Sequence, residues 1–296
     1  MIKKALVVIN PKAGIKKSNR LLTDIVSELQ KGEYLVTVYV TRKQGDGNRF
    51  VVKNVKNFSL VVAVGGDGTF NEVVAGVIAS GTKTNIGYIP SGSTNDFAST
   101  LRLPLSPVKA ATNIIKGTPK AFDVGVFNGR VFTYVASFGA FTGSSYNAPQ
   151  EVKNSIGHLA YIFEGVKDIG NIKGFNLDVK TEEKSFSGRY IFGSISNTTS
   201  LGGLLKINEE IVDLSDGKLE LMFIKEPKNI KELNQILSAI NLKNYTDCPM
   251  IDFCSARSID IITKDDFNWT IDGEKQNGSP IIEVKNVEKA IKLLTV

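Results

Sequence analysis

The sequence predicts an α/β protein: a doubly wound parallel sheet in the N-terminal part, then an antiparallel, β-sandwich-like domain in the C-terminal part. Strand and helix patterns alternate up to about residue 120, which is typical of a parallel sheet with helices on both faces. Beyond that point, short strand patterns separated by turn signals predominate. The 296 residues, 42% of them hydrophobic, are enough for two globular domains.

Hydrophobic periodicity locates the elements of the N-terminal part. Residues 60–64 are an uncharged, β-branched run with the length of a buried parallel strand. Similar patterns predict strands at 5–10, 34–41 and 85–90, and helices at 18–30 (capped by Ser18), 47–55, 69–79 and 106–116. Ligands of such sheets bind at the carboxyl ends of the strands. The turns at 10–14, 65–69 and 90–96 and the strand end at Thr41 are therefore expected to line one cleft.

The C-terminal part begins with a hairpin. Residues 123–127 and 131–137 alternate around Asn128-Gly129, a strong signal for a two-residue hairpin turn. The pattern then predicts strands at 175–181, 186–196, 219–224, 250–255, 258–263, 267–271, 280–284 and 290–296, and helices at about 155–169 and 230–240. We assign residues 1–126 and the strand 288–296 to the first domain and residues 127–287 to the second.

Composition excludes several classes of protein. The net charge is +6 with scattered lysines and no nucleic-acid-binding motif, so we expect no nucleic-acid partner. A single histidine, His158, excludes a multi-histidine metal site, and Cys248 and Cys254 fit no disulfide framework or zinc spacing. No apolar stretch approaches the roughly 18 residues of a membrane span, and the first strand is too short for a signal peptide. A cytoplasmic location is expected.

The turn Gly65-Gly66-Asp67-Gly68-Thr69 points to phosphate chemistry. Its glycines let the backbone turn sharply and approach a ligand, and Thr69 stands where a helix would begin. Free N–H groups at a helix N-terminus bind anions. Because the carboxylate of Asp67 would repel phosphate, we predict a cation between them, and so a nucleotide phosphate with Mg²⁺. The alternative is a tight turn with a capping aspartate.

Followed by Asn71-Glu72, this turn resembles the signature of the diacylglycerol kinase and NAD kinase superfamily. Four further stretches are similar to motifs of bacterial diacylglycerol kinase-like lipid kinases: Asn10-Pro11-Lys12-Ala13-Gly14, residues 90–98, Asp216-Gly217 and Asp272-Gly273-Glu274. The Gly65 turn alone does not separate lipid kinases from NAD kinases. The loop around Ser93 and the turn at 272–274 favour the lipid branch.

The resemblance implies a Rossmann-like nucleotide-binding domain, a β-rich lipid domain, and ATP bound in the cleft between them. It implies Mg²⁺-dependent transfer of the ATP γ-phosphate to the hydroxyl of a diacylglycerol-like lipid. Asp67 would hold Mg²⁺ or its waters, Asp123 would complete that network, and Glu274 would be the catalytic base. The residues implied to contact ATP are Asn10, Thr41, Gly66, Asp67, Gly68, Thr69, Phe70, Asn71, Glu72 and Ser93. A second, structural Mg²⁺ maps to Asp213, Asp216 and the backbone oxygen of Lys218.

The residues themselves leave simpler interpretations open. Glu274 also fits an ordinary hairpin tip, Asp123 a solvated strand residue, and the pair Asp213 and Asp216 an Asp-Gly turn in a loop. Three departures from the family pattern matter. Ala13 stands where Ser is frequent, Ser93 stands where Thr is common, and residues 208–213 lack the usual proline and alanine.

The expected partners are ATP and a lipid at the inner membrane surface, where the basic charge would favour anionic lipid. Apolar residues at 138–141, 161–163 and 201–205 are candidates for a lipid groove, although each fits a core role better. An exposed edge strand of the second domain is able to pair with a copy of itself, giving a homodimer. The rival functions are an NAD kinase and an inactive nucleotide- or lipid-binding regulator. Intact Asp67 and Glu274 argue against the regulator.

Overall fold

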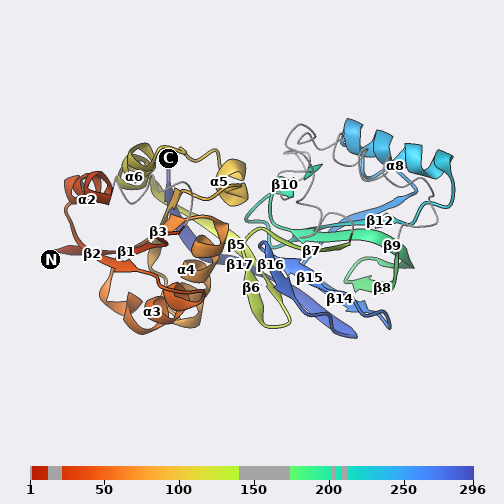
Figure 1. The fold of residues 1–296 in the computed structure, drawn as a ribbon, viewed down its shortest axis with the longest axis horizontal. Coiled ribbons are helices and arrows are strands. Elements are labelled where there is room, and N and C mark those ends of the chain that lie inside the picture. Colours follow the sequence, from red (N-terminus) through yellow and green to blue (C-terminus); the bar gives the residue numbers. More distant parts are fainter. Residues whose placement is uncertain (1, 13–21, 140–173, 202–204, 208–211) are drawn as a thin grey trace. The chain divides into compact units, whose positions relative to one another are not determined.

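A computed structural model describes residues 2–12, 22–139, 174–201, 205–207 and 212–296. The chain forms two compact units (Figure 1). Unit 1 comprises Met1–Val124 and Glu288–Val296, and unit 2 comprises Gly125–Val287. The chain passes between the units twice, within β5 (Thr118–Phe127) and within β17 (Ile281–Thr295). Helices around parallel strands in unit 1 and antiparallel strands in unit 2 confirm the predicted fold class.

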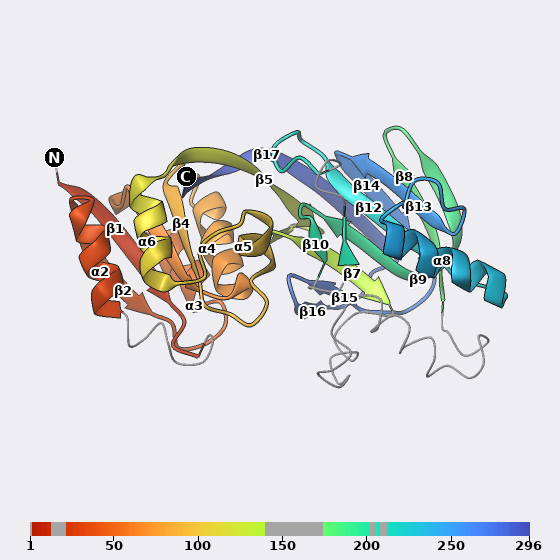
Figure 2. The ribbon, with the colours of Figure 1, turned by 90° about the horizontal axis from the view of Figure 1, so that it is seen from above.

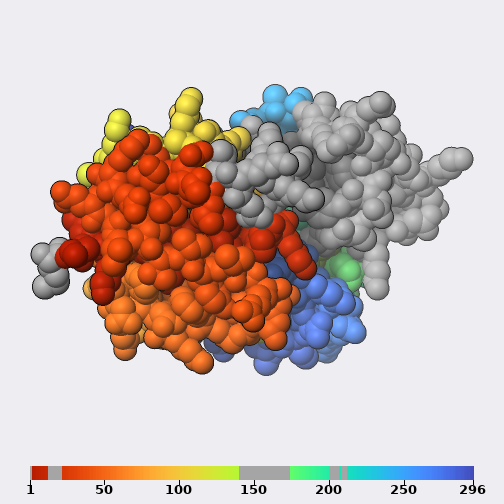
Figure 3. All heavy atoms as spheres, turned by 60° about the vertical axis from the view of Figure 1, so that its left-hand side comes forward, coloured from red at the N-terminus to blue at the C-terminus, as the bar shows by residue number. Residues whose placement is uncertain are grey.

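Unit 1 is built on parallel strands in the order β4-β3-β1-β2. These strands are β1 (Lys3–Ile9), β2 (Tyr34–Val40), β3 (Leu60–Gly65) and β4 (Asn85–Pro90). The end of β17 extends the sheet, since Leu293 pairs in parallel with Ile86 of β4. Every residue of β3 is buried, as expected for an uncharged strand with helices on both faces. β2 is the edge strand, and with α3 it forms part of the red-orange surface of unit 1 in Figure 3.

Helices cover both faces of this sheet (Figure 1). α2 (Leu22–Lys31) and α6 (Pro107–Lys116) lie together on one face, and α3 (Asp46–Asn54) and α4 (Asp67–Ala79) on the other. Ile25, Leu29 and Ile114 pack against Val62 and Val64 of the central strand. The remaining pieces are the 3-10 turn η1 (Val55–Asn57) and the short α5 (Asp96–Thr100). The buried apolar stripes explain why the helical periodicity is visible in the sequence.

Unit 2 consists of antiparallel strands and one described helix, α8 (Ile230–Leu242). Its other strands are β6 (Arg130–Phe132), β7 (Val135–Gly139), β8 (Phe175–Thr181), β9 (Ser185–Ser196), β10 (Ser200–Leu201), β11 (Leu205–Lys206), β12 (Leu219–Lys225), β13 (Ile251–Ala256), β14 (Ser258–Ile262), β15 (Trp269–Ile271) and β16 (Glu274–Gln276). α8 lies over β9 and β12, where Ile236 packs with Met222 and Ile224 (Figure 2). A second, aromatic core contains Phe138, Phe223 and Trp269.

Two hairpins of unit 2 have the same turn. Asn128 and Gly129 have φ of 45° and 82°, and Phe127 pairs with Arg130 across the turn. Positive φ at both central residues is the type I′ geometry, which fits the twist of the strands, so the predicted hairpin is confirmed. Asp272 and Gly273 repeat this geometry, with φ of 47° and 82°, between β15 and β16.

Several sequence predictions need correction. The helix expected at 69–79 begins at Asp67, and the strand expected at 131–137 is broken into β6 and β7. The strands expected at 280–284 and 290–296 are one strand, β17, because its middle is polar and mostly exposed and so carries no apolar alternation. The short α5 and β16 were not predicted. The helix expected at 155–169, His158 and the Ser18 cap lie outside the described residues.

Candidate active site

The turn after β3 places Asp67 in the first turn of α4. Gly66 caps this helix with an extended backbone, and its carbonyl accepts the N–H groups of Thr69 at 3.0 Å and Phe70 at 3.1 Å. The expected position of Thr69 at the helix start is therefore wrong by two residues. A carboxylate in the first turn is favoured by the helix dipole, which explains why the helix begins at Asp67.

The loop after β4 lies directly against this turn. Ser91 N–H donates to the Gly65 carbonyl at 2.8 Å, and a Cβ added at Gly92 would lie only 2.5 Å from Gly66 Cα. Asn95 holds the loop through both edges of its amide, accepting from Gly92 N–H at 2.8 Å and donating to the Gly92 carbonyl at 2.9 Å. Only glycine allows two backbones to approach this closely.

Asn95 belongs to the 90–98 motif, but the sequence analysis gave it no role. It is buried and has a left-handed backbone, with φ of 53°. Asparagine tolerates this conformation better than most residues and readily bonds nearby backbone groups. An asparagine three residues after a glycine, just before a helix, was the available signal.

The Asp67 carboxylate is buried, with the residue 6% exposed. Its oxygens accept from Thr94 Oγ1 at 3.4 Å and from the N–H groups of Asp96 at 3.2 Å and Phe97 at 3.4 Å. Burial raises the pKa of Asp67, and these hydrogen bonds oppose the rise. Asp67 is thus a residue of α4 whose side chain caps the N-terminus of α5.

Asp96 adds a second carboxylate to this place. It is 3% exposed, and it was part of a motif in the sequence but was not singled out. Burial raises the pKa of Tyr88, and the negative charges of Asp67 and Asp96 raise it further. Because both carboxylates raise the pKa of the same tyrosine, they lie close to each other and concentrate negative charge there. Such a place suits a hard cation, which prefers oxygen ligands.

The other strand ends line the same edge of the sheet. Asn10 follows β1 and donates its N–H to the Val64 carbonyl at 3.0 Å, while its Oδ1 accepts from Lys12 N–H at 2.9 Å. Thr41 follows β2, is buried, and donates its N–H to the Ile9 carbonyl at 2.9 Å. Ser93, in the loop after β4, is exposed.

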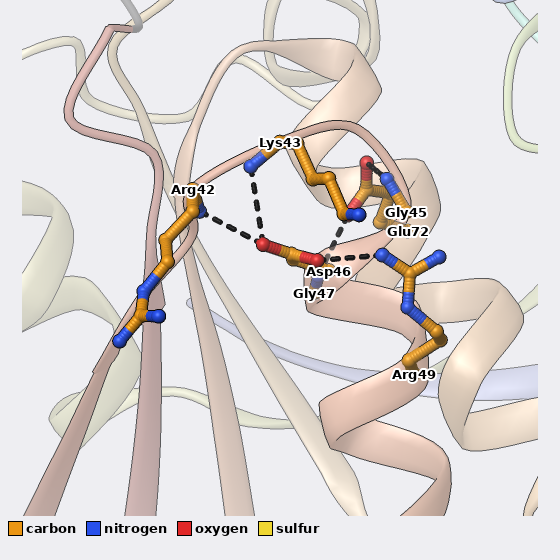
Figure 4. Close-up of polar contacts among 7 residues, drawn as sticks. All are labelled: Arg42, Lys43, Gly45, Asp46, Gly47, Arg49 and Glu72. Atoms are coloured by element: carbon orange, nitrogen blue, oxygen red, sulfur yellow. Dashed lines mark hydrogen bonds and ion pairs between the residues drawn. The ribbon is translucent and has the colours of Figure 1, made fainter.

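Glu72 is engaged within the fold (Figure 4). Its carboxylate accepts the N–H groups of Gly45 at 2.6 Å and Gly47 at 2.9 Å, at the start of α3. A Cβ added at Gly47 would lie 2.7 Å from Glu72 Oε2. Glu72 therefore caps α3, and a contact with ATP remains a prediction.

Asp46 organises the neighbouring basic residues in the same view (Figure 4). Its Oδ2 accepts the N–H groups of Arg42 at 3.0 Å and Lys43 at 3.1 Å, and its Oδ1 pairs with Arg49 Nη2 at 2.5 Å. These contacts fix the backbone that follows Thr41.

Asp123 is fully buried in β5. Its Oδ1 accepts the N–H of Lys289 at 2.7 Å, which ties β5 to the part of β17 that belongs to unit 1. The interpretation of Asp123 as a solvated strand residue is therefore wrong. Its contribution to a magnesium network remains a prediction.

Glu274 begins β16, directly after the Asp272-Gly273 turn. Its Oε2 pairs with Arg130 Nη2 at 2.5 Å, and its side chain is 37% exposed. Asp272 accepts four hydrogen bonds, from Thr133 N–H at 2.7 Å and Oγ1 at 2.9 Å, Tyr134 N–H at 3.1 Å and Val135 N–H at 3.0 Å. Burial raises the pKa of Asp272 to about 6, against these hydrogen bonds. Glu274 thus stands on a hairpin whose turn is firmly anchored.

The expected structural metal site lies in the loop before β12. Asp213 Oδ1 accepts from Ser215 N–H and Oγ, both at 3.0 Å, and Asp216 Oδ1 accepts from Lys218 N–H at 2.9 Å. The Lys218 carbonyl accepts from Asn286 Nδ2 at 2.8 Å. Both aspartates are exposed. Across the described ranges, no three His, Cys, Asp or Glu side chains are grouped to hold a metal ion.

The candidate lipid segments are only partly described. Phe138 is fully buried in the aromatic core, which agrees with the core role that the sequence favoured for it. Leu201 and Leu205 lie in β10 and β11, which pair with each other. Residues 140–141, 161–163 and 202–204 lie outside the described residues.

Comparison with known proteins identifies the family. Residues 4–127 match the family described as "Diacylglycerol kinase catalytic domain", and residues 139–295 match the "YegS C-terminal NAD kinase beta sandwich-like domain". The chain is 30% identical over 275 residues to a diacylglycerol kinase of Staphylococcus saprophyticus, covering 93% of this chain and 90% of that protein. It is also 30% identical over 296 residues to one of Staphylococcus epidermidis, covering 100% of this chain and 93% of that protein.

Solved structures share the fold. The chain resembles a diacylglycerol kinase from Bacillus anthracis str. Sterne with a TM-score of 0.77 at 23% identity, covering 99% of this chain and 97% of that one. A further structure from the same organism has a TM-score of 0.81 at 25% identity, covering 99% and 95%. The glycine turns around Asp67, the anchored 272–274 turn and these likenesses lead to one conclusion: the chain belongs to the bacterial diacylglycerol kinase-like family of lipid kinases.

Proposed function

We propose that this chain transfers the γ-phosphoryl group of ATP to the hydroxyl of a diacylglycerol-like lipid, with the help of Mg²⁺. The observation that carries the proposal is the contact between the Gly66 and Gly92 backbones beside the buried carboxylate of Asp67. The relatives are named diacylglycerol kinase, which supports the lipid acceptor. NAD kinase is named in the description of the C-terminal domain family, which supports a related domain and not an NAD acceptor.

We propose that ATP contacts the strand ends of unit 1, at Asn10, Thr41, Ser93 and residues 66–72. The N–H groups in the first turn of α4 and the glycine backbones beside them support a phosphate site. Glu72 accepts the N–H groups of Gly45 and Gly47, so it would also fix the backbone that follows Thr41 at this site.

The residues of unit 1 fit a magnesium ion. Mg²⁺ keeps several waters and takes only one or two protein carboxylates, so Asp67 and Asp96 are a sufficient donor set. When bound, Mg²⁺ neutralises the charge that phosphoryl transfer develops on the phosphate oxygens. The proposed role of Asp67 is to hold the ion or its waters, and that of Asp123 is to complete the network from the middle of β5.

Glu274 is the proposed base. Its carboxylate would accept the proton of the lipid hydroxyl as that oxygen attacks the γ-phosphorus and the bond to the ADP oxygen breaks. A part-exposed carboxylate on an anchored hairpin suits this role, because a base must reach its proton in a defined orientation.

A second, structural metal ion is proposed at Asp213, Asp216 and the carbonyl of Lys218. Each carboxylate bonds the protein through Oδ1, so Oδ2 is able to accept a cation, and a carbonyl oxygen has a second lone pair. These are hard oxygen donors, which fit Mg²⁺ or a similar ion.

The proposed site of action is the inner surface of the cell membrane, and a homodimer through an edge strand of unit 2 is proposed as the assembly. The net charge of +6 supports attraction to anionic lipid. Among the described helices, none is long and apolar enough to cross a membrane.

The test is an assay with radiolabelled ATP and Mg²⁺ against vesicles containing diacylglycerol, and separately against NAD. The unaltered chain should label the lipid, and Asp67→Asn should reduce labelling by at least about 100-fold, the scale of a lost electrostatic contact with a transition state. Asp24→Asn, in the exposed first turn of α2, is the control and should keep full activity. Full activity of Asp67→Asn would contradict the role of Asp67, and labelling of NAD alone would contradict the lipid acceptor.

A further inference from the structure

We propose that Arg130 is a positioning residue for Glu274, an inference that rests on the proposed role of Glu274 as the base. Arg130 is the first residue of β6, directly after the Asn128-Gly129 turn. Its Nη2 donates to Glu274 Oε2 at 2.5 Å, and its Nη1 donates to Gln276 Oε1 at 3.1 Å. Because side chains two apart in a strand share a face, the guanidinium spans both side chains of that face of β16.

The backbone under Glu274 is already fixed without Arg130. Asp272 accepts the N–H groups of three successive residues, Thr133 to Val135, and its own N–H donates to the Val135 carbonyl at 2.9 Å. The turn at 272–273 is therefore held against the chain that joins β6 to β7. What remains to be set is the orientation of the Glu274 side chain, and the contact with Arg130 sets it.

Orientation matters because of what a base must do. A glutamate side chain has three rotatable bonds, and a proton acceptor must come within hydrogen-bond distance of the hydroxyl it serves. Arg130 occupies Oε2, while Oε1 has no hydrogen-bond partner within the part of the chain that the structure describes. A planar guanidinium that binds two neighbouring side chains holds Oε1 in one direction more strictly than a point charge would.

A purely structural ion pair is the competing explanation, and unit 2 contains a matched example. Arg189 Nε pairs with Glu226, and their side chains are 51% and 24% exposed. The Arg130 and Glu274 side chains are 33% and 37% exposed. Part-exposed pairs of this kind contribute little to folding, so the two pairs should differ in activity and not in stability.

The experiment compares Arg130→Met, Arg130→Lys and Arg189→Met in the full chain, with vesicles containing diacylglycerol. Arg130→Met should lower kcat by about 10- to 100-fold, the cost of a misplaced catalytic group, and leave the KM for ATP and the urea unfolding midpoint unchanged. The kcat of Arg130→Lys should lie between those of Arg130→Met and the unaltered chain, because lysine keeps the charge but lacks the planar set of guanidinium donors. Arg189→Met should keep the full kcat.

A double variant separates positioning from any other effect of Arg130. If Arg130 acts through Glu274, then Arg130→Met should cost nothing further in a Glu274→Gln background. An equal loss in both backgrounds, or a normal kcat for Arg130→Met beside an inactive Glu274→Gln, would overturn this inference and leave the proposed function standing. Full activity of Glu274→Gln would overturn the proposed base and this inference together.

Discussion

Asp67 in unit 1 and Asp272 in unit 2 are both buried motif aspartates that accept backbone N–H groups, yet they are held very differently. Asp272 receives four donors at 2.7–3.1 Å. The hydrogen bonds that Asp67 accepts from Thr94 Oγ1 and from the N–H groups of Asp96 and Phe97 are longer, at 3.2–3.4 Å. Short hydrogen bonds to a charged acceptor are the strong ones.

The difference separates a carboxylate that supports the fold from one that is available to a ligand. Each oxygen of Asp272 accepts two protein donors, so the protein itself surrounds this carboxylate, although burial still raises its pKa. Asp67 accepts longer hydrogen bonds, and a second carboxylate, that of Asp96, raises the pKa of the same tyrosine. A bound cation would reduce the repulsion between these two negative charges. The sequence treats both residues alike, as an aspartate followed by glycine.

The largest expected difference in folding is between alanine substitutions at the two sites. Asp272→Ala would leave three buried N–H groups and the Thr133 hydroxyl without their acceptor, and should lower the free energy of unfolding by about 3–5 kcal/mol. Asp67→Ala should cost about 1–2 kcal/mol because its bonds are longer. Urea unfolding followed by circular dichroism, with the fluorescence of Trp269 as a probe of unit 2, measures both. Equal losses at the two sites would refute the comparison.

The next effect is on pH dependence. The pKa of Asp272 is raised to about 6 by burial, so between about pH 4 and pH 6 the folded chain binds a proton that the unfolded chain has released. The free energy of unfolding should therefore fall as pH rises through this range, by about 3 kcal/mol for roughly two pKa units. Asp272→Asn should remove this part of the pH dependence of Trp269 unfolding curves. A variant that keeps the unaltered slope would show that another group titrates.

The smallest effect comes from removing one hydroxyl donor at each site. Thr133 Oγ1 donates to Asp272 at 2.9 Å, whereas Thr94 Oγ1 lies 3.4 Å from Asp67. Thr133→Val should cost about 1.5–3 kcal/mol of unfolding free energy, as expected for a buried bond to a charged group. Thr94→Val, at an exposed residue, should cost under about 0.5 kcal/mol. The same urea titrations apply, and a larger cost at Thr94 would reverse the assignment of the two aspartates.

Much of the fold was readable from local patterns. The run at 60–64 became β3, and Asn128-Gly129 became a type I′ turn, because burial on both faces and positive φ each demand particular residue types at fixed spacing. The middle of β17 is polar, so the sequence predicted two strands where the structure has one. The five-residue α5 was not predicted because it is too short to show a helical periodicity.

The candidate site was readable only as motifs at strand ends. Chain order places Asn10, Thr41, Gly65 and Ser91 at the carboxyl ends of neighbouring parallel strands, and the structure has them there. The hydrogen bonds between Asn95 and Gly92 and the burial of Asp96 beside Asp67 were not predicted. They depend on the path of a loop, which periodicity does not describe.

Residue types and their order thus establish the fold class, the hairpins and the motifs that identify the family, since these follow from preferences of short segments. Tertiary structure alone decides what each carboxylate does. Asp123 bonds a backbone group 166 residues away, and Glu274 an arginine 144 residues away. Such contacts depend on how distant strands pack, and packing determines both the burial of a charge and the donors that reach it.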